Sequence, residues 1–580
     1  MCGIYGITTR NHKFIEDYIT QCSYRGPDGS DIWSDDNVTL GHNLLAITSQ
    51  PTQGKQPWQT SKGVLVYNGE IFNYNELKDQ YKDSFQPKTT CDTEFLSWYL
   101  SNHDPLTCPQ ILDSMHGFAW YDKQTRLLYL SRDHAGIKPV YYAEIGAGLV
   151  FGSEIKGLLD IVPNARKLDQ MSASMMSTTG LNVGRNTMFS NIKRLLPGET
   201  LVYDVMKKKI LQRKLDNVIP ESNRSLDLEE FRYEANQTVK MCTLGIRKFG
   251  MFLSGGLDST LVAYELKNIL GELDSFTNTV EPNVVLSNED HNDDAIHAEK
   301  FAKEFGLNHH KVVCTPNDVL RNWESSVACF EEPRYAMSIP MYYQTNKFLA
   351  DKGVVVTMAG DMGDELLGGY QKYWKLRKEG IASYDDMLWK WMHRIKRPLQ
   401  LSNFVIDKNE ILEELKNNIP EKIWNPEDPI NSYMALDCLT QVPEEFFTRN
   451  DKFGMKFSME GRFPLATKRF MKYCLGIHSK HKIGETKADT KLPTKLAYKG
   501  ILPDYILNKS KTGWTVPLSY WLTHRNGNTY AKLYKYAHDS MKEKNPLDDI
   551  VTMSNWNHGK TKVVSWMVRT WAKHYGLIAK

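Results

Sequence analysis

The chain has 580 residues, of which 41% are hydrophobic, and its formal net charge is +3. This length exceeds what one hydrophobic core usually supports, so we expect two domains, and so small and dispersed a charge does not predict nucleic-acid binding. No apolar run approaches the roughly 18–20 residues of a membrane span, and the start does not resemble a signal peptide. Nine cysteines without a Cys-x-x-Cys pair argue against disulfides and zinc, so we expect a cytoplasmic protein without a membrane partner.

The first informative residue is Cys2, in the opening segment Met-Cys-Gly-Ile-Tyr-Gly. Removal of Met1 would place a thiol and a free α-amine on one residue. An α-amine titrates at about 7.7–8.0, so it can accept the thiol proton directly or through a water. Composition alone puts a cysteine at a given position roughly one time in sixty, so chance is the alternative to a nucleophile.

Six further motifs follow in order, and the whole series spans 155 residues, at 2–156. They are Arg-Gly-Pro-Asp at 25–28, Asn-Gly-Glu-Ile-Phe-Asn at 68–73, Cys-Asp-Thr-Glu at 91–94, Gly-Phe-Ala at 117–119, Arg-Asp-His-Ala-Gly-Ile-Lys-Pro at 132–139 and Ser-Glu-Ile-Lys at 153–156. Together with the start, this series resembles the class II (N-terminal nucleophile, Ntn) glutamine amidotransferase domain, in the form found in glutamine-dependent asparagine synthetase.

The resemblance implies a role for each polar residue near the nucleophile. Attack on a side-chain amide creates an oxyanion that needs preorganised donors. Asn68 and the backbone N–H of Gly69 match the family's oxyanion hole, and a glycine lets the backbone approach closely. Glu70 and Asp92 match the carboxylates that hold the α-ammonium of glutamine. An Asn-Gly pair is also a common hairpin turn, and the two interpretations are compatible.

Leu44 departs from the family pattern. The family usually has His-x-Arg-Leu-x-Ile here, and its arginine binds the α-carboxylate of glutamine, whereas this chain has His-Asn-Leu-Leu-Ala-Ile at 42–47. A bidentate arginine–carboxylate contact is strong, so its absence puts the affinity for glutamine, or the identity of the nitrogen donor, in question. Arg25 is the nearest alternative cation in the matched motifs, although the family's arginine there usually has a structural role.

The next motif lies at 254–259, Ser-Gly-Gly-Leu-Asp-Ser. An apolar run at 248–253, this loop and the residues from Thr260 onward predict a strand, a tight turn and the start of a helix. A helix N-terminus behind glycines suits pyrophosphate. The hexapeptide resembles the PP-loop of ATP pyrophosphatases, which cleave between the α and β phosphates. The resemblance assigns ATP binding to Leu253, Ser254, Gly255, Gly256, Asp258, Ser259 and, from a later loop, Gly360.

That later loop follows a predicted strand at 354–358 and reads Ala-Gly-Asp-Met-Gly-Asp-Glu-Leu-Leu-Gly-Gly-Tyr at 359–370. It resembles the family's Ser-Gly-(Asp/Glu)-Gly-x-Asp-Glu-x-x-Gly-Gly-Tyr. Mg²⁺ prefers carboxylate and phosphate oxygens, so Asp258 and Asp364 are the expected metal ligands. Asp361 matches the acid that helps to form the acyl-adenylate or deprotonates the attacking amine. Ala359 and Met362 replace the usual serine and glycine.

Downstream motifs continue the resemblance at 450–451, 459–464 and 511–517. Lys491 matches the lysine that neutralises charge on the adenylate and the leaving group, although a lysine in this position could equally be surface charge. Leu-Ala-Thr at 465–467 replaces the family's Phe-Leu-Asp, and Pro493 is unusual near that lysine.

A link rich in Pro, Ser and Asn at 216–223 predicts the domain boundary. The resemblance implies an α/β protein with a four-layer αββα Ntn-type glutaminase domain at 1–215. It implies a parallel-sheet adenine-nucleotide α-hydrolase-like domain at 225–580. We expect ATP and Mg²⁺ as cofactors, and a homodimer is possible.

The function that we predict is glutamine-dependent amidation of the aspartate β-carboxylate. Cys2 would release ammonia from glutamine, ATP would convert the carboxylate to an acyl-adenylate, and ammonia would displace AMP. One alternative is a related amidotransferase acting on a carboxylate of a sugar, a modified base or a peptide. The alternative from another class is a degenerate, non-enzymatic scaffold, against which the intact Cys2, Asp258 and Asp364 argue.

Overall fold

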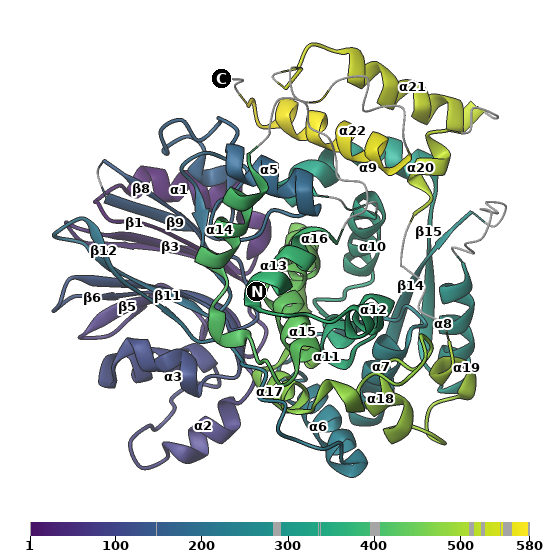
Figure 1. Cartoon of the computed structure of the whole chain (residues 1–580). Coiled ribbons are helices and arrows are strands. Elements are labelled where there is room, and N and C mark those ends of the chain that lie inside the picture. Colours follow the sequence, from purple (N-terminus) through teal and green to yellow (C-terminus); the bar gives the residue numbers. More distant parts are fainter. Residues whose placement is uncertain are drawn as a thin grey trace.

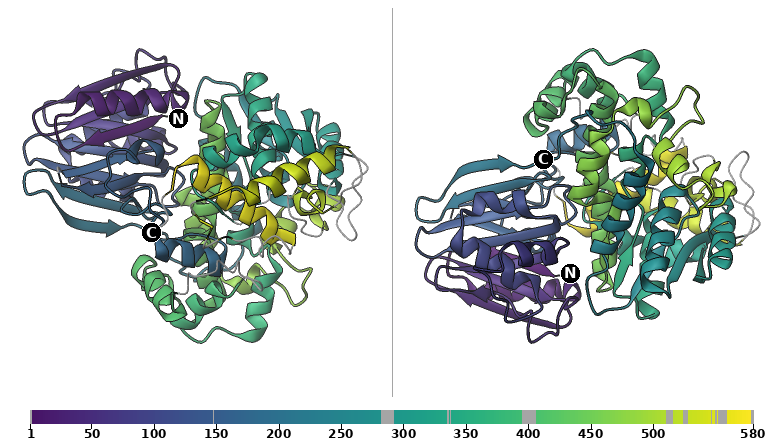
Figure 2. Two further views of the ribbon diagram at one scale, coloured as in Figure 1. Left: turned by 90° about the horizontal axis from the view of Figure 1, so that it is seen from above. Right: turned by 90° about the horizontal axis from the view of Figure 1, so that it is seen from below.

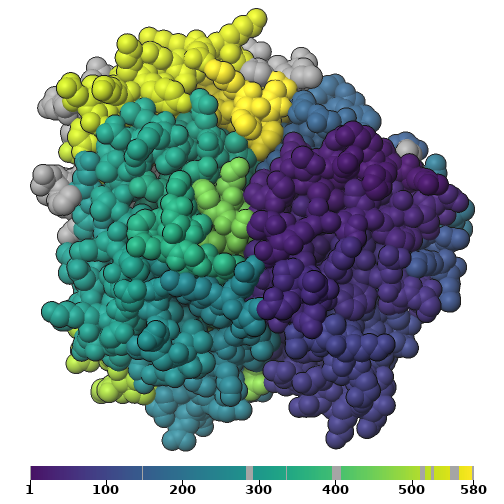
Figure 3. Space-filling model, turned by 180° about the vertical axis from the view of Figure 1, so that it is seen from behind, coloured from purple at the N-terminus to yellow at the C-terminus, as the bar shows by residue number. Residues whose placement is uncertain are grey.

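The computed structural model describes residues 2–146, 148–281, 292–334, 336, 338–394, 406–509, 516–523, 528–545, 547–548, 551 and 559–577. The N-terminal strands form one unit and the later residues form a second unit beside it (Figure 1, Figure 2). From behind, the purple surface of the N-terminal unit meets teal and green surfaces of the later residues along one seam (Figure 3). Among the described residues, none of the helices has the length and apolar character needed to span a bilayer.

The N-terminal unit contains two antiparallel sheets of six strands each. The first has the order β10-β8-β9-β1-β3-β2, with β10 (Lys193–Arg194), β8 (Tyr141–Ile145), β9 (Gly148–Gly152), β1 (Gly3–Ile7), β3 (Thr39–Leu44) and β2 (Gly29–Ser34). The second has the order β12-β11-β7-β6-β5-β4, with β12 (Lys209–Leu215), β11 (Glu199–Asp204), β7 (Leu127–Arg132), β6 (Ser114–Asp122), β5 (Gly63–Ile71) and β4 (Trp58–Gln59).

Apolar side chains from both sheets form the core between them, including Ile4, Leu40, Val64 and Val66, which are fully buried. Helix α1 (His12–Gln21) covers the outer face of the first sheet, while α2 (Tyr74–Gln80) and α3 (Asp92–Asn102) cover the second (Figure 1). This stacking confirms the predicted four-layer αββα arrangement.

The C-terminal unit is built on a parallel sheet of five strands in the order β15-β14-β13-β16-β17. These are β15 (Asn308–Cys314), β14 (Asp274–Val280), β13 (Phe249–Phe252), β16 (Val356–Met358) and β17 (Glu460–Arg462). In chain order, β14 and β15 add to one side of β13, and β16 and β17 then add to its other side. Ligands of open α/β sheets bind outside the carboxyl ends of the strands at such a switch point, which here lies between β13 and β16.

Helices surround this sheet and complete the unit. They are α5 (Gln170–Thr179) from the N-terminal part of the chain, then α6 (Leu228–Met241), α7 (Leu257–Leu270), α8 (Asp293–Glu304), α9 (Pro316–Phe330), α10 (Ile339–Asp351), α11 (Gly363–Leu367), α12 (Gln371–Glu379), α13 (Tyr384–Met392), α14 (Lys408–Asn418), α15 (Pro429–Leu439), α16 (Thr448–Lys456), α17 (Lys468–Gly476), α18 (Leu492–Ala497), α19 (Asp504–Leu507), α20 (Leu518–Trp521), α21 (Asn528–Lys542) and α22 (Gly559–His574), whereas the short helix α4 (Cys108–Ile111) packs with α3 and the second sheet of the N-terminal unit. Helices α20, α21 and α22 pack above α9 (Figure 1), where Trp566 stacks on Trp323 with ring centroids 3.7 Å apart.

Candidate active sites

Cys2 lies immediately before β1, and its side chain is 7% exposed. Its backbone nitrogen donates a hydrogen bond of 2.9 Å to Oδ1 of Asn68, which lies on β5 of the second sheet. Burial raises the pKa of the Cys2 thiol, so the resting side chain is protonated and needs a base before it can attack. The two facing sheets thus bring Cys2, the predicted nucleophile, into contact with Asn68, the predicted oxyanion-hole residue.

Asn68 and Gly69 lie inside β5, which pairs with β6 along its whole length, so the hairpin-turn interpretation of this Asn-Gly pair is wrong. Within the described structure, Nδ2 of Asn68 is buried without a hydrogen-bond partner. A Cβ at position 69 would lie 2.2 Å from the carbonyl oxygen of Met115, so only glycine fits there. One buried, unused donor therefore lies beside the thiol-bearing residue.

A small pocket opens beside Cys2 and contains most of the residues predicted to bind glutamine. It is lined by Cys2, Leu44, Leu45, Ala46, Ile47, Thr48, Ser49, Gly54, Gln56, Tyr67, Gly69, Glu70, Cys91, Asp92, Thr93 and Glu460. Asp92 begins α3, and its Oδ2 accepts hydrogen bonds of 3.0 Å from the Tyr67 hydroxyl and from the Ile71 nitrogen. Burial raises the pKa of Asp92 to about 6.

Glu70 makes a contact that the sequence did not predict. Its Oε2 lies 3.2 Å from Nη2 of Arg462 on β17, in the other unit. Arg462 also donates a hydrogen bond of 2.6 Å to Glu460, which lines the pocket itself. Burial opposes ionisation of Glu460, but positive charges that include Arg462 lower its pKa to about 2. The motif at 459–464 was visible in the sequence, but nothing local showed that it reaches the N-terminal pocket.

Arg25 does not line the pocket, and its charge is paired elsewhere. The side chain is fully buried, and its Nη1 lies 3.0 Å from Asp451 and 2.5 Å from Glu154. Its Nε donates a hydrogen bond of 3.1 Å to the carbonyl oxygen of Cys2. These contacts fit a role in holding the Cys2 backbone and do not support the predicted contact with a glutamine carboxylate.

The second candidate site lies at the switch point of the parallel sheet. The loop after β13 contains Gly255 at φ +75°, where a Cβ would lie 2.2 Å from the carbonyl oxygen of Asp294. Gly256 is the N-cap of α7, so this helix begins at Leu257, three residues earlier than predicted. The Ser254 and Ser259 hydroxyls lie 2.9 Å apart across the loop. The loop and the positive end of a 14-residue helix are suited to a phosphate group.

Three predicted residues converge next to this loop. Nζ of Lys491 lies 2.5 Å from a carboxylate oxygen of Asp258 and 2.5 Å from one of Asp364. A single cation therefore already sits between the two carboxylates, a position that would also suit Mg²⁺. No group of three or more His, Cys, Asp or Glu side chains able to hold a metal occurs in the described part of the chain, so a bound Mg²⁺ would need phosphate or water oxygens as well.

The loop after β16 closes the other side of this site. A Cβ at Gly360 would lie 2.6 Å from the Ser259 nitrogen, so the two loops nearly touch. Asp361 is 3.8 Å from Nη2 of Arg449, and its side chain is partly exposed. Met362 is buried at φ +76°, a backbone conformation that favours glycine. Of the motif at 511–517, residues 511–515 lie outside the described residues.

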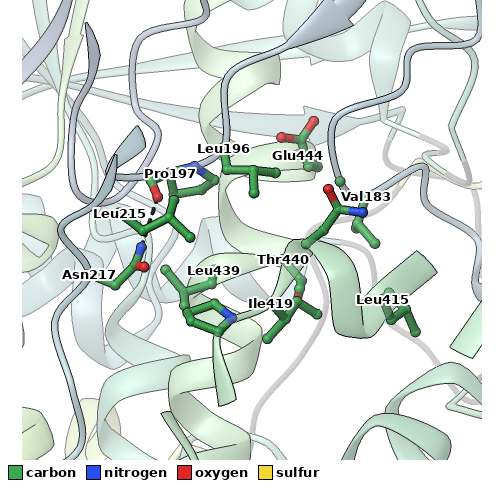
Figure 4. A pocket seen from close by; sticks show the side chains of 13 residues that line it. Val183, Leu196, Pro197, Leu215, Asn217, Leu415, Ile419, Leu439, Thr440 and Glu444 are labelled. Carbon is green, nitrogen blue, oxygen red and sulfur yellow. Dashed lines mark hydrogen bonds between the residues drawn. The ribbon is translucent and has the colours of Figure 1, made fainter. Parts of the chain in front are cut away.

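Another pocket lies at the junction of the two units (Figure 4). Apolar side chains from both units line it, among them Leu196 and Leu439, and the Asn217 amide donates a hydrogen bond of 2.8 Å to the carbonyl oxygen of Pro197. Glu444 at its edge forms an ion pair with Arg194. None of the predicted site residues lines this pocket.

Comparisons with known proteins identify both units. Residues 1–214 match the model of the glutamine amidotransferase domain, which gives the class of the first unit. Residues 230–564 match the asparagine synthase model, and the chain belongs to the asparagine synthase family. The predicted resemblance is thus confirmed.

Curated relatives match over most of the chain. Asparagine synthetase [glutamine-hydrolyzing] 3 of Bacillus subtilis is 27% identical, covering 88% of this chain and 86% of that protein. Asparagine synthetase [glutamine-hydrolyzing] 1 of the same organism is 24% identical, covering 90% and 88%. Asparagine synthetase B [glutamine-hydrolyzing] of Escherichia coli is 28% identical, covering 65% and 66%.

Proposed function

We propose that this chain is an ATP-dependent ligase that amidates the β-carboxylate of aspartate with ammonia released from an amide donor, giving asparagine, AMP and pyrophosphate. The observation that supports this proposal most is that one chain contains both candidate sites, the pocket beside Cys2 and the loop site at the parallel sheet. The residue that carries the buried thiol is hydrogen-bonded to Asn68, whose side-chain N–H group is unused, and a phosphate-type loop lies beside two converging carboxylates.

The first site supports hydrolysis of a side-chain amide. After removal of Met1, the α-amine of Cys2 takes the thiol proton and Sγ bonds to the amide carbon. Nδ2 of Asn68 and the N–H of Gly69 stabilise the oxyanion. The C–N bond then breaks and ammonia leaves with the proton. Water cleaves the thioester, which releases the acid and restores the thiol.

The second site supports formation of an acyl-adenylate. The glycine loop and the N-terminus of α7 hold the phosphates of ATP, and Lys491 neutralises charge on the leaving group. Asp258 and Asp364 would hold Mg²⁺, which when bound would stabilise the departing pyrophosphate. Asp361 follows Gly360, which approaches the glycine loop, and its proposed role is to accept a proton from ammonia as the amine displaces AMP.

One observation favours a different carboxylate substrate. Met362 places a buried, bulky side chain beside Asp361, in a left-handed conformation, where the family usually has glycine. This substitution changes the wall next to the reacting carboxylate. The second candidate is therefore a ligase of the same type that amidates another carboxylate, on a sugar, a modified base or a peptide. A homodimer and a cytoplasmic location remain predictions.

The test is pyrophosphate release from ATP when carboxylic acids are added one at a time. We expect aspartate to give the largest rate, with AMP formed in equal amount. A larger rate with another acid would identify that acid, in place of aspartate, as the substrate that is amidated. No pyrophosphate with any acid would overturn the assignment of a ligase and favour the non-enzymatic scaffold.

A further inference from the structure

The pocket beside Cys2 has an unusual balance of charge for a site that is to bind an amino acid. Three carboxylates line it, those of Glu70, Asp92 and Glu460, whereas no lysine, arginine or histidine occurs among the described residues of its lining. Arg462 contacts two of these carboxylates but is fully buried behind them. The chain's amino terminus, Arg462 and Lys138 all lower the pKa of Glu460, but neither the arginine nor the lysine lines the pocket.

One oxygen of the Glu70 carboxylate has no hydrogen-bond donor. In the described structure, Oε1 of Glu70 is buried and has no hydrogen-bond partner, while Oε2 of the same group is paired with Arg462. A buried acceptor without a donor carries a free-energy cost, which a ligand can remove by supplying one. An ammonium group supplies three N–H donors together with the opposite charge. The pocket is therefore complementary to an ammonium.

The polar side chains Thr48, Ser49, Gln56 and Thr93 in the lining carry no charge, so no part of the lining offers a cation to the α-carboxylate of a ligand. The remaining wall is apolar. It is formed by Leu44, Leu45, Ala46 and Ile47, and Leu44 is almost completely buried. Arg247 donates to the carbonyl oxygen of Ala46 and to Asp28, but it does not line the pocket. A carboxylate placed between an apolar wall and three acidic groups would lose its hydration without gaining an ion pair.

We propose that this pocket selects amide donors that carry a free ammonium but no free α-carboxylate, such as glutamine whose α-carboxyl group is amidated or joined in a peptide bond. The inference rests on the glutaminase role proposed for Cys2 and adds the substrate class of that site. The chemistry is unchanged, because Sγ still displaces ammonia from the side-chain amide and water hydrolyses the thioester.

The experiment compares four donors with the full-length wild-type protein. They are L-glutamine, L-glutamine α-amide, L-glutaminylglycine and N-acetyl-L-glutamine. Ammonia release gives kcat/KM, and mass spectrometry confirms that the side-chain amide was cleaved. We expect the better of the two carboxyl-blocked donors to exceed glutamine by at least about tenfold, the effect of about one charge-assisted contact. If the α-amide is the better of the two, the source is an amidated amino acid, and if glutaminylglycine is the better, the source is a peptide. N-acetyl-L-glutamine should be the poorest of the four donors.

Two variants locate the selectivity. Leu44→Arg should lower the preference for blocked donors, because it adds a cation to the apolar wall, whereas the matched Leu44→Met should keep the wild-type ranking. If wild-type protein uses glutamine as well as or better than both blocked donors, this inference is overturned and the glutaminase assignment stands. If none of the four donors yields ammonia, the glutaminase role itself fails and the inference falls with it.

Discussion

Arg462 on β17 of the C-terminal unit pairs with Glu70 on β5 of the N-terminal unit, across 3.2 Å. The same strand lies beside β16, and the carbonyl oxygen of Arg462 accepts a 3.2 Å hydrogen bond from the nitrogen of Ala359, where the acidic loop begins. A three-residue strand therefore contacts the pocket beside Cys2 with its side chains and the loop after β16 with its backbone. The pocket beside Cys2 is complete only when both units are present.

Replacing Cys2 by alanine should abolish ammonia release from any amide donor and leave ammonia-dependent pyrophosphate release intact, because the two reactions use separate sites. Cys91→Ala is a matched control, since Cys91 lines the same pocket. Burial raises the pKa of the Cys91 thiol to about 12, so it stays protonated and unreactive. Ammonia release that persists in Cys2→Ala would remove the assigned nucleophile.

Asp258→Asn and Asp364→Asn should each lower pyrophosphate release about 10²-fold or more with either nitrogen source, because each removes one of the two converging carboxylates. Hydrolysis of the amide donor should change little. Asp274→Asn is a suitable control, since this carboxylate lies at the opposite end of the sheet, at the start of β14. Undiminished pyrophosphate release in both variants would show that the metal site is misplaced.

Local sequence was sufficient to predict the elements of the second candidate site. The apolar run, the glycine loop and the helix around Asp258 follow one another directly, and only the helix start was misplaced, because Gly256 acts as its N-cap. Asn68 shows the limit of this reasoning. Its strand is fixed by pairing with residues 114–122, a distant partner that local turn propensity does not reveal.

Contacts between the units could not be predicted in the same way. The partners of Arg25 include Asp451, 426 positions away in the chain, so a motif containing the arginine carries no sign of that pairing. Glu460 and Arg462 were recognised as part of a motif, yet their reach into the donor pocket depends on how the two units pack. Burial of an unpaired charge costs free energy, so Glu460 and Arg462 are buried as an ion pair. This reason becomes usable only once the fold shows that both side chains are buried.

Replacing Arg462 by methionine should destabilise the protein by about 3–5 kcal/mol, since it leaves the carboxylates of Glu70 and Glu460 buried without their cation. The double variant Glu70→Gln/Arg462→Met should lose less stability than the sum of the two single variants, because it removes one of the unpaired charges. Chemical denaturation of all four proteins measures this coupling. Additive losses would mean that the pair contributes no net interaction.

Binding of glutamine should weaken as the pH falls below about 6, because burial raises the pKa of Asp92 to that value. Above pH 6 the carboxylate is charged and attracts the ammonium, whereas below pH 6 binding must first release a proton. Protonation of Asp92 alone therefore lowers the affinity by at most about tenfold per pH unit. Burial also raises the pKa of Glu70, which acts in the same direction, while Glu460, with a pKa of about 2, keeps its charge.

Calorimetric titration of the Cys2→Ala protein with glutamine between pH 5 and 7 measures this dependence without turnover. The same protein carrying Asp92→Asn should bind more weakly at pH 7 and show a shallower pH dependence, since among the described residues that line the pocket Glu70 is then the remaining carboxylate with a raised pKa. An affinity that stays constant or rises on acidification would show that Asp92 does not contact the donor's ammonium.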